Sequence, residues 1–223
     1  MNNRENFKVI VSKIRPKEIP LWEDCQWKRD ACNKDSCPFC GKINKLTESR
    51  LKTVENKKEN KANFEELGKT FDDVVNLFRS DAKRLGIDLD AGTFDESIPF
   101  PEDYSICRKL INWQQGIYDI ASESDDIFDI WLHSDAGKNL LWYSNTIISK
   151  TYRQLLSIDR MRTEKNLTLK LDFKYTAYIL NEVIKIIDDS LEKLSQSKTG
   201  GNHSVKFKIA QICFRKIRDD IKK

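Results

Sequence analysis

Four cysteines crowd into sixteen residues near the start of the chain, namely Cys25, Cys32, Cys37 and Cys40. A segment this short cannot bury a hydrophobic core of its own, whereas four thiolates on tight turns supply the tetrahedral ligand set that Zn²⁺ prefers. The spacing therefore predicts one four-cysteine metal site that holds zinc. A closed site of this kind has no open coordination position, so it predicts a structural role and no activation of water.

The second pair of cysteines belongs to the run Cys37-Pro38-Phe39-Cys40-Gly41. This run resembles the CPxCG knuckle of zinc ribbons and treble clefs. The resemblance is limited to this element within residues 25–41, and it implies two thiolates on one narrow turn with a positive φ at Gly41. The first pair, Cys25 and Cys32, is separated by six residues where a ribbon has two.

An iron–sulfur cluster is the alternative to zinc. Cys32, Cys37 and Cys40 have the C-x4-C-x2-C spacing of plant-type ferredoxins, in which the fourth ligand follows downstream. The downstream cysteines here, Cys107 and Cys213, lie among apolar neighbours in amphipathic patterns, which predicts inert core residues. Zinc is therefore the preferred ion, with the iron–sulfur cluster left open.

The remainder of the chain is patterned mainly as helices. Apolar residues at helical spacing predict helices over residues 64–85, 101–120, 127–131, 139–162, 172–194 and 203–221, with Asp172 as an N-cap. Alternating apolar and polar residues over 7–14 predict a short strand. The expected fold is mainly α, a small N-terminal four-cysteine zinc module followed by an antiparallel bundle of about four to five helices.

The predicted organisation has three parts. Residues 1–45 form the zinc module with the short strand, residues 46–62 a charged linker or exposed helix, and residues 63–223 the bundle. Net charge changes along the chain, from +6 over residues 1–62 to −11 over 63–135 and +9 over 136–223. This polarity fits either a basic nucleic-acid surface or opposite charges that meet inside one bundle.

Aromatic and basic residues occur together around the cysteines, and basic residues recur along two of the predicted helices. Aromatic rings can stack on bases while cations bind phosphates, although the same rings could instead form the core of the module. The candidate residues for binding DNA or RNA are Trp27, Lys28, Arg29, Lys34, Phe39, Lys42 and Lys45 in the module, and Lys150, Arg153, Arg160, Lys208, Arg215 and Arg218 on the helices.

The sequence has no phosphate-binding loop, no dinucleotide fingerprint and no nucleophile elbow, and neither His133 nor His203 completes a di-iron motif. These absences favour a non-enzymatic role, although residues that converge only in the fold could still form an active site. The leading hypothesis is a zinc-binding, nucleic-acid-associated protein, and the alternative is an adaptor that binds another protein subunit. The sequence has neither a signal peptide nor a run long enough to span a membrane, so a soluble, cytoplasmic protein without a membrane partner is expected.

Overall fold

The computed structural model describes residues 8–30, 32–41, 44, 98–122, 134–163, 167–196 and 202–222. The chain divides into two compact units, residues 1–31 with 99–223 and residues 32–98. The first unit contains a helical bundle, and the second is described at residues 32–41, 44 and 98. None of the described helices is both long and apolar enough to cross a membrane.

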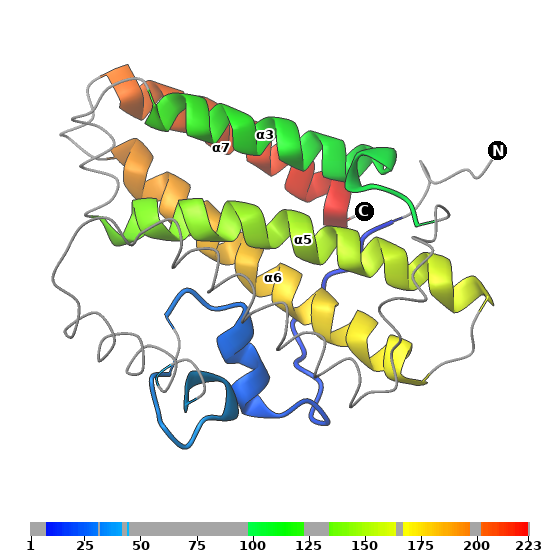
Figure 1. The fold of residues 1–223 in the computed structure, drawn as a ribbon. Helices are drawn as coiled ribbons and strands as arrows, with labels where there is room; N and C mark the ends of the chain where they lie inside the picture. The colour runs from blue at the N-terminus through cyan, green and yellow to red at the C-terminus, as the bar shows by residue number, and fades with distance from the viewer. Residues whose placement is uncertain are drawn as a thin grey trace, which may run out of the picture. The chain divides into compact units, whose positions relative to one another are not determined.

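The bundle consists of α3 (Ser105–Ala121), α5 (Asp135–Thr163), α6 (Leu167–Gln196) and α7 (Asn202–Lys222). Successive helices run in opposite directions, as the colours in Figure 1 show. Each helix packs against two others, because α5 and α7 both contact α3 and α6. The prediction of a mainly α chain, with the cysteine cluster ahead of an antiparallel bundle, is confirmed, and the described part of the bundle contains four helices.

The core of the bundle is built from apolar side chains that recur at helical spacing on the facing sides of the helices. The pair Trp113 and Phe214 joins α3 to α7, with ring centroids 4.8 Å apart, and the Trp113 Nε1 donates a hydrogen bond to the Ala210 carbonyl at 3.0 Å. Burying both an aromatic body and its polar nitrogen makes this contact specific in register. Fully buried members of the core include Leu110, Ile117, Leu140, Ile147, Leu155, Leu180, Ile187 and Phe214.

The start of α6 differs from the predicted one. The helix begins at Leu167, so Asp172 lies inside it and the prediction of an N-cap at Asp172 is wrong. The Asp172 carboxylate instead accepts hydrogen bonds from Arg153 Nε at 3.0 Å and Ser157 Oγ at 3.4 Å on α5. An acceptor that finds donors on a neighbouring helix has no need to cap its own backbone.

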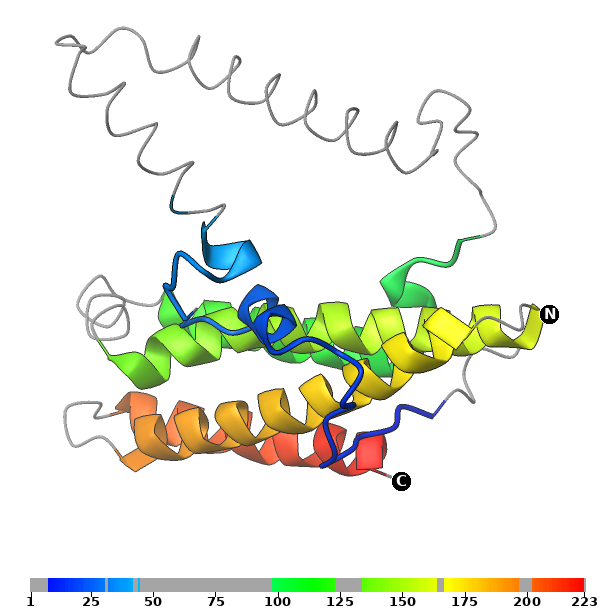
Figure 2. The ribbon, with the colours of Figure 1, turned by 90° about the horizontal axis from the view of Figure 1, so that it is seen from below.

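The described part of the predicted strand, residues 8–14, is irregular, so that prediction is wrong. Its peptide groups bond to helices: Gln154 accepts from the Ile10 nitrogen and donates to the Ile10 oxygen, both at 2.8 Å. The Ser12 nitrogen donates to the Ala177 oxygen of α6 at 2.9 Å. Because the side-chain amide of Gln154 occupies the hydrogen-bonding positions of a partner strand, the segment lies extended along the bundle without a sheet (Figure 2).

Three further predictions fall outside the described residues. They are the helices over 64–85 and 127–131 and the linker over 46–62. The division at residues 45 and 62 stays a prediction for the same reason. Residues 8–30 belong to the same compact unit as the four helices.

Candidate metal centre

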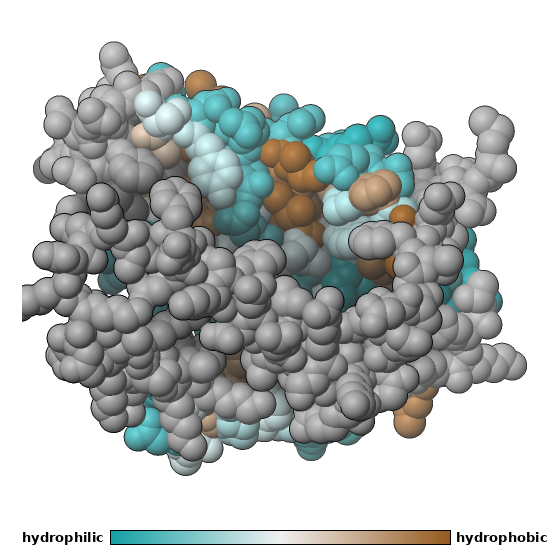
Figure 3. All heavy atoms as spheres, viewed as in Figure 1, coloured by the Kyte–Doolittle hydropathy of each residue, from teal (hydrophilic) through white to brown (hydrophobic). Residues whose placement is uncertain are grey.

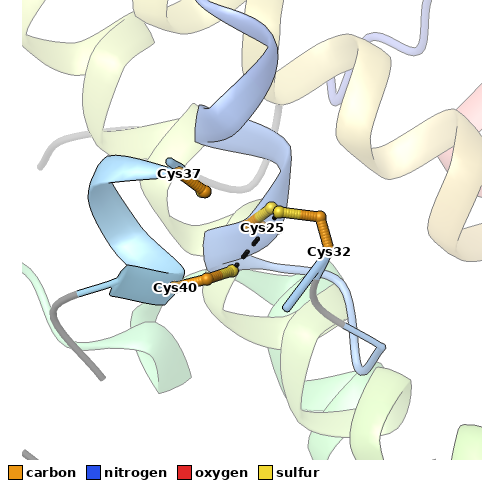
Figure 4. A group of neighbouring side chains, drawn as sticks. All are labelled: Cys25, Cys32, Cys37 and Cys40. Carbon is orange, nitrogen blue, oxygen red and sulfur yellow. Dashed lines mark hydrogen bonds between the residues drawn. The ribbon is translucent and has the colours of Figure 1, made fainter. Parts of the chain in front are cut away.

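The four cysteines of the predicted site come together. The Sγ atoms of Cys25, Cys32, Cys37 and Cys40 all lie within 4.8 Å of one another, and Figure 4 shows the side chains converging. Cys25, Cys37 and Cys40 are buried and Cys32 is exposed, and the sulfurs of Cys32 and Cys40 are 3.5 Å apart. A compact group of four sulfurs, three of them shielded from water, can hold a metal ion.

The second pair of cysteines lies on one short turn. The Cys37 nitrogen donates to the Lys34 oxygen at 2.9 Å, and the Gly41 nitrogen donates to the Cys37 oxygen at 2.8 Å. A Cβ atom at position 41 would lie 2.5 Å from the Asp35 oxygen, so only glycine fits there. The expected positive φ is found instead at Asn33, where φ is 49°. Glycine is therefore needed at position 41 for close backbone approach, and not for its φ angle.

Cys25 is positioned by its neighbour Asp24, which anchors the 3₁₀ helix η2 (Leu21–Gln26). The buried Asp24 carboxylate accepts hydrogen bonds from Tyr175 Oη at 2.7 Å and from the Arg15 guanidinium at 3.2 Å. Burial, followed by the hydrogen bond to Asp24, raises the pKa of Tyr175 above its usual value, so this hydroxyl stays a donor throughout the neutral range. The anchor therefore ties the residue before the first cysteine to α6.

A second anchor fixes the chain just after Cys25. Trp27 is 3% exposed and meets Tyr143 edge to face, and its carbonyl oxygen accepts a hydrogen bond from Trp142 Nε1 at 3.0 Å. The Arg29 nitrogen donates to Tyr143 Oη at 3.1 Å, and Arg29 Nε donates to Asn139 Oδ1 at 2.6 Å. The residues on both sides of Cys25 are thus held by the bundle.

The residues predicted to bind nucleic acid fall into different environments around the cysteines. Trp27 packs in the core, so stacking on a base would require its ring to leave that core. The Lys28 ammonium lies 3.7 Å from the Asp24 carboxylate and over the Trp27 ring, while Lys34 is exposed and Phe39 half-buried. Lys42 and Lys45 lie outside the described residues. Nucleic-acid binding by the residues around the cysteines stays a prediction.

The two basic helical stripes contain both paired cations and exposed ones. Arg153 pairs with Asp172, and Arg218 pairs with Asp188 at 2.8 Å. Arg160, Lys208 and Arg215 are exposed. Part of the charge polarity of the sequence is therefore neutralised by ion pairs between neighbouring helices.

A small polar cavity of about 180 Å³ lies beside η2, α5 and α6. Its charged lining consists of two cations, Lys150 and Arg153, and two carboxylates, Glu23 and Asp172. Burial, and then the charge of Arg153, lower the pKa of Lys150. Because acids and bases balance, this cavity does not extend the basic strip that the sequence predicted.

The two remaining cysteines differ from each other. Cys107 is fully buried, as predicted, and burial raises the pKa of its thiol to about 12. Cys213 is exposed, so its predicted place in the core is wrong. It lies on the outer side of α7, beside the stripe of residues that faces the core.

This difference predicts selective thiol chemistry. In the metal-loaded protein at about pH 8, a disulfide reagent should modify Cys213 rapidly, because it is accessible, and leave Cys107 protonated and protected. Counting modified thiols by mass spectrometry, with a Cys213→Ala variant as control, checks this expectation. Rapid modification of Cys107 in the folded protein would contradict its burial.

The Asp24 anchor predicts that α6 influences metal affinity. Replacing Tyr175 by phenylalanine removes the hydroxyl that fixes Asp24, and we expect zinc binding to weaken roughly tenfold, as when outer partners of metal ligands are lost. Competition with a chromophoric chelator measures the effect. The matched control is Tyr178→Phe, since the Tyr178 ring stacks on Tyr175 and its hydroxyl has no hydrogen bond among the described residues. Equal zinc affinity in the two variants would show that the hydrogen bond from Tyr175 to Asp24 does not support zinc binding.

No protein-family model, no curated protein and no solved structure matches this chain.

Proposed function

We propose that the chain is a non-enzymatic protein whose cysteine segment is folded around one structural zinc ion. The observation that carries this proposal is the mutual approach of the four sulfurs to within 4.8 Å. Four thiolates bound to a single zinc ion at about 2.3 Å form a tetrahedron with edges of about 3.8 Å, so small shifts of the side chains close the site. No ligand position is left for water, which suits a structural role.

The same distances favour zinc over an iron–sulfur cluster. A cluster places its cysteines on two or four separate iron atoms, so some ligand sulfurs must stand further apart than those around one ion. Here every pair of the four sulfurs lies within 4.8 Å. This compactness supports a mononuclear centre.

Elemental analysis with an ultraviolet–visible spectrum on anaerobically purified protein tests the proposal. We expect one zinc per chain and no absorption at wavelengths longer than the protein's own ultraviolet band, since zinc has a filled d shell. Brown protein containing iron and inorganic sulfide would overturn it. Colourless, metal-free protein that does not take up added zinc would also overturn it.

We further propose that the bundle serves as an adaptor that binds another protein. The supporting observation is the outer face of α7, where Val205, Ile209 and Ile212 are each more than half exposed. Apolar side chains gathered on an outer helix face are typical of interaction surfaces. Affinity capture with the full chain tests this role, because a partner that binds the parent should be lost with Ile209→Asp.

Nucleic-acid binding is the second candidate function. It is supported by Lys34, Lys208 and Arg215, which are exposed and form no ion pair among the described residues. Binding of single-stranded or duplex oligonucleotides that weakens steeply with added salt would favour it over the adaptor role. Absence of binding at low salt would eliminate it.

A further inference from the structure

A groove runs between α3 and α7 on the outer surface of the bundle. Its volume is about 280 Å³, and its lining includes Trp113, Gly116 and Ile120 from α3 and Ile209 and Cys213 from α7. Trp113 is held by its hydrogen bond to the Ala210 carbonyl and by its contact with Phe214, so this wall of the groove is fixed. Figure 3 shows the adjoining face of the bundle, formed by α3 and α5, where apolar side chains also reach the surface among polar ones.

The groove is open at Gly116, which sits in the middle of α3. A Cβ atom built at this position would meet nothing within 4 Å. Glycine lowers helix stability by about 1 kcal/mol relative to alanine, so the helix gains nothing locally from having it there. What glycine provides is space, which allows another chain to approach the backbone of α3 closely.

The apolar surface continues from the groove along α7. Val205, Ile209 and Ile212 are 55%, 56% and 53% exposed, and their spacing places them on one face of the helix. These three residues occupy positions i, i+4 and i+7, the spacing at which amphipathic helices make apolar contacts with a partner. A partner helix laid along α7 would cover all three side chains.

On α7, the charges beside this surface are cationic. Lys208 and Arg215 flank the apolar line on the side away from the groove, Lys206 lines the groove itself, and the first carboxylate along α7 is Asp219. A second copy of the chain that docked through this same face would bring the same cations together and would be repelled. A helix with acidic flanks would instead pair with Lys208 and Arg215.

From these observations we infer that the α3–α7 groove and the adjoining face of α7 bind an amphipathic helix with acidic flanks, contributed by a partner protein. The apolar side of that helix lies on Ile209 and the groove at Gly116, and its carboxylates face Lys208 and Arg215. This inference rests on the proposed adaptor role and specifies the chemistry of the partner.

The test is a display selection of helical peptides of about 20 residues on the full-length, metal-loaded protein. Enriched peptides should have apolar residues at the spacing of one helix face and a negative net charge, and their binding should weaken with added salt. The Cβ atom that Gly116→Leu introduces meets nothing within 4 Å, so the new side chain can extend into the groove, and we expect it to weaken binding at least tenfold. Leu167→Asp, at an exposed position at the start of α6, is the control that should retain binding.

Several results would overturn the inference. The first two concern the selection: no peptide is enriched, or the enriched peptides are neutral or basic. The third is peptide binding that stays unchanged in Gly116→Leu. The fourth is a dimer of this chain, seen by sedimentation, that dissociates in Ile209→Asp. A captured protein that depends on Ile209, combined with selected peptides that are not acidic, would preserve the adaptor role and reject the acidic helix. If no captured protein depends on Ile209 and the selected peptides are not acidic, both the adaptor role and the acidic helix are rejected.

Discussion

Replacing Cys40 by serine is expected to abolish stoichiometric zinc binding and to unfold the cysteine segment while leaving the bundle helical. Cys40 is 2% exposed, and a serine hydroxyl is a far weaker ligand for zinc than a thiolate. Structural zinc sites contribute apparent binding energies of about 10–16 kcal/mol in small peptides, so losing one ligand removes the main source of order in a segment without its own core. Metal analysis and far-ultraviolet circular dichroism measure the two effects separately.

Limited trypsin digestion locates the change. Lys34 lies between the cysteines, and cleavage there should accelerate strongly in the variant and in chelator-treated parent protein. Lys28 and Arg29 are held by contacts outside the cysteine cluster, so cleavage after them should change less. Cys213→Ser is the matched control, because Cys213 is exposed on α7 and is not among the four clustered sulfurs. Full zinc content in Cys40→Ser would show that the four sulfurs do not act as one site.

The sequence was sufficient to predict those elements whose physics is local. The predicted helix over 101–120 corresponds to the 3₁₀ helix η3 (Pro101–Asp103) followed by α3, and those over 139–162 and 203–221 correspond to α5 and α7. Their apolar residues recur at helical spacing. The four cysteines could be grouped for a similar reason, since a short segment can bring together only ligands that are close in sequence. Close spacing makes such predictions nearly independent of the rest of the fold.

The errors came where a distant partner decided the outcome. Asp172 resembles an N-cap until Arg153 and Ser157 of α5 are seen to bind its carboxylate. The alternation over residues 7–14 resembles a strand until Gln154 of α5 is seen to bond both peptide groups of Ile10. Neither partner could be inferred from one sequence, because both contacts depend on how the helices pack.

The supports of the metal centre were missed for the same reason. Asp24 and Tyr175 are 151 residues apart, and nothing in the local sequence of either indicates that they share a hydrogen bond. Trp27 suggested a stacking surface by its position among cysteines and cations, and only the bundle reveals that its ring is buried. The apolar neighbours of Cys213 predict a core residue, although its position on the helix places it outside the stripe of Phe207, Phe214 and Ile221.

The largest loss of bundle stability is expected from Phe214→Ala. The Phe214 side chain is fully buried and its ring lies 4.8 Å from that of Trp113, so truncation leaves a cavity at the contact between α3 and α7. Substitutions of this kind lower the free energy of unfolding by about 3–5 kcal/mol, a large share of the stability of an ordinary domain. Urea denaturation followed by circular dichroism measures the change.

The same helix provides the control that makes this prediction specific. Ile212 is 53% exposed on the opposite side of α7, so Ile212→Ala should change the free energy of unfolding by less than about 0.5 kcal/mol. Both variants remove apolar atoms, and the helix propensity of alanine is equal in both, so the difference between them isolates packing in the core. Similar losses for the two would mean that Ile212 is buried in solution, and that the outer face of α7 is already covered before any partner binds.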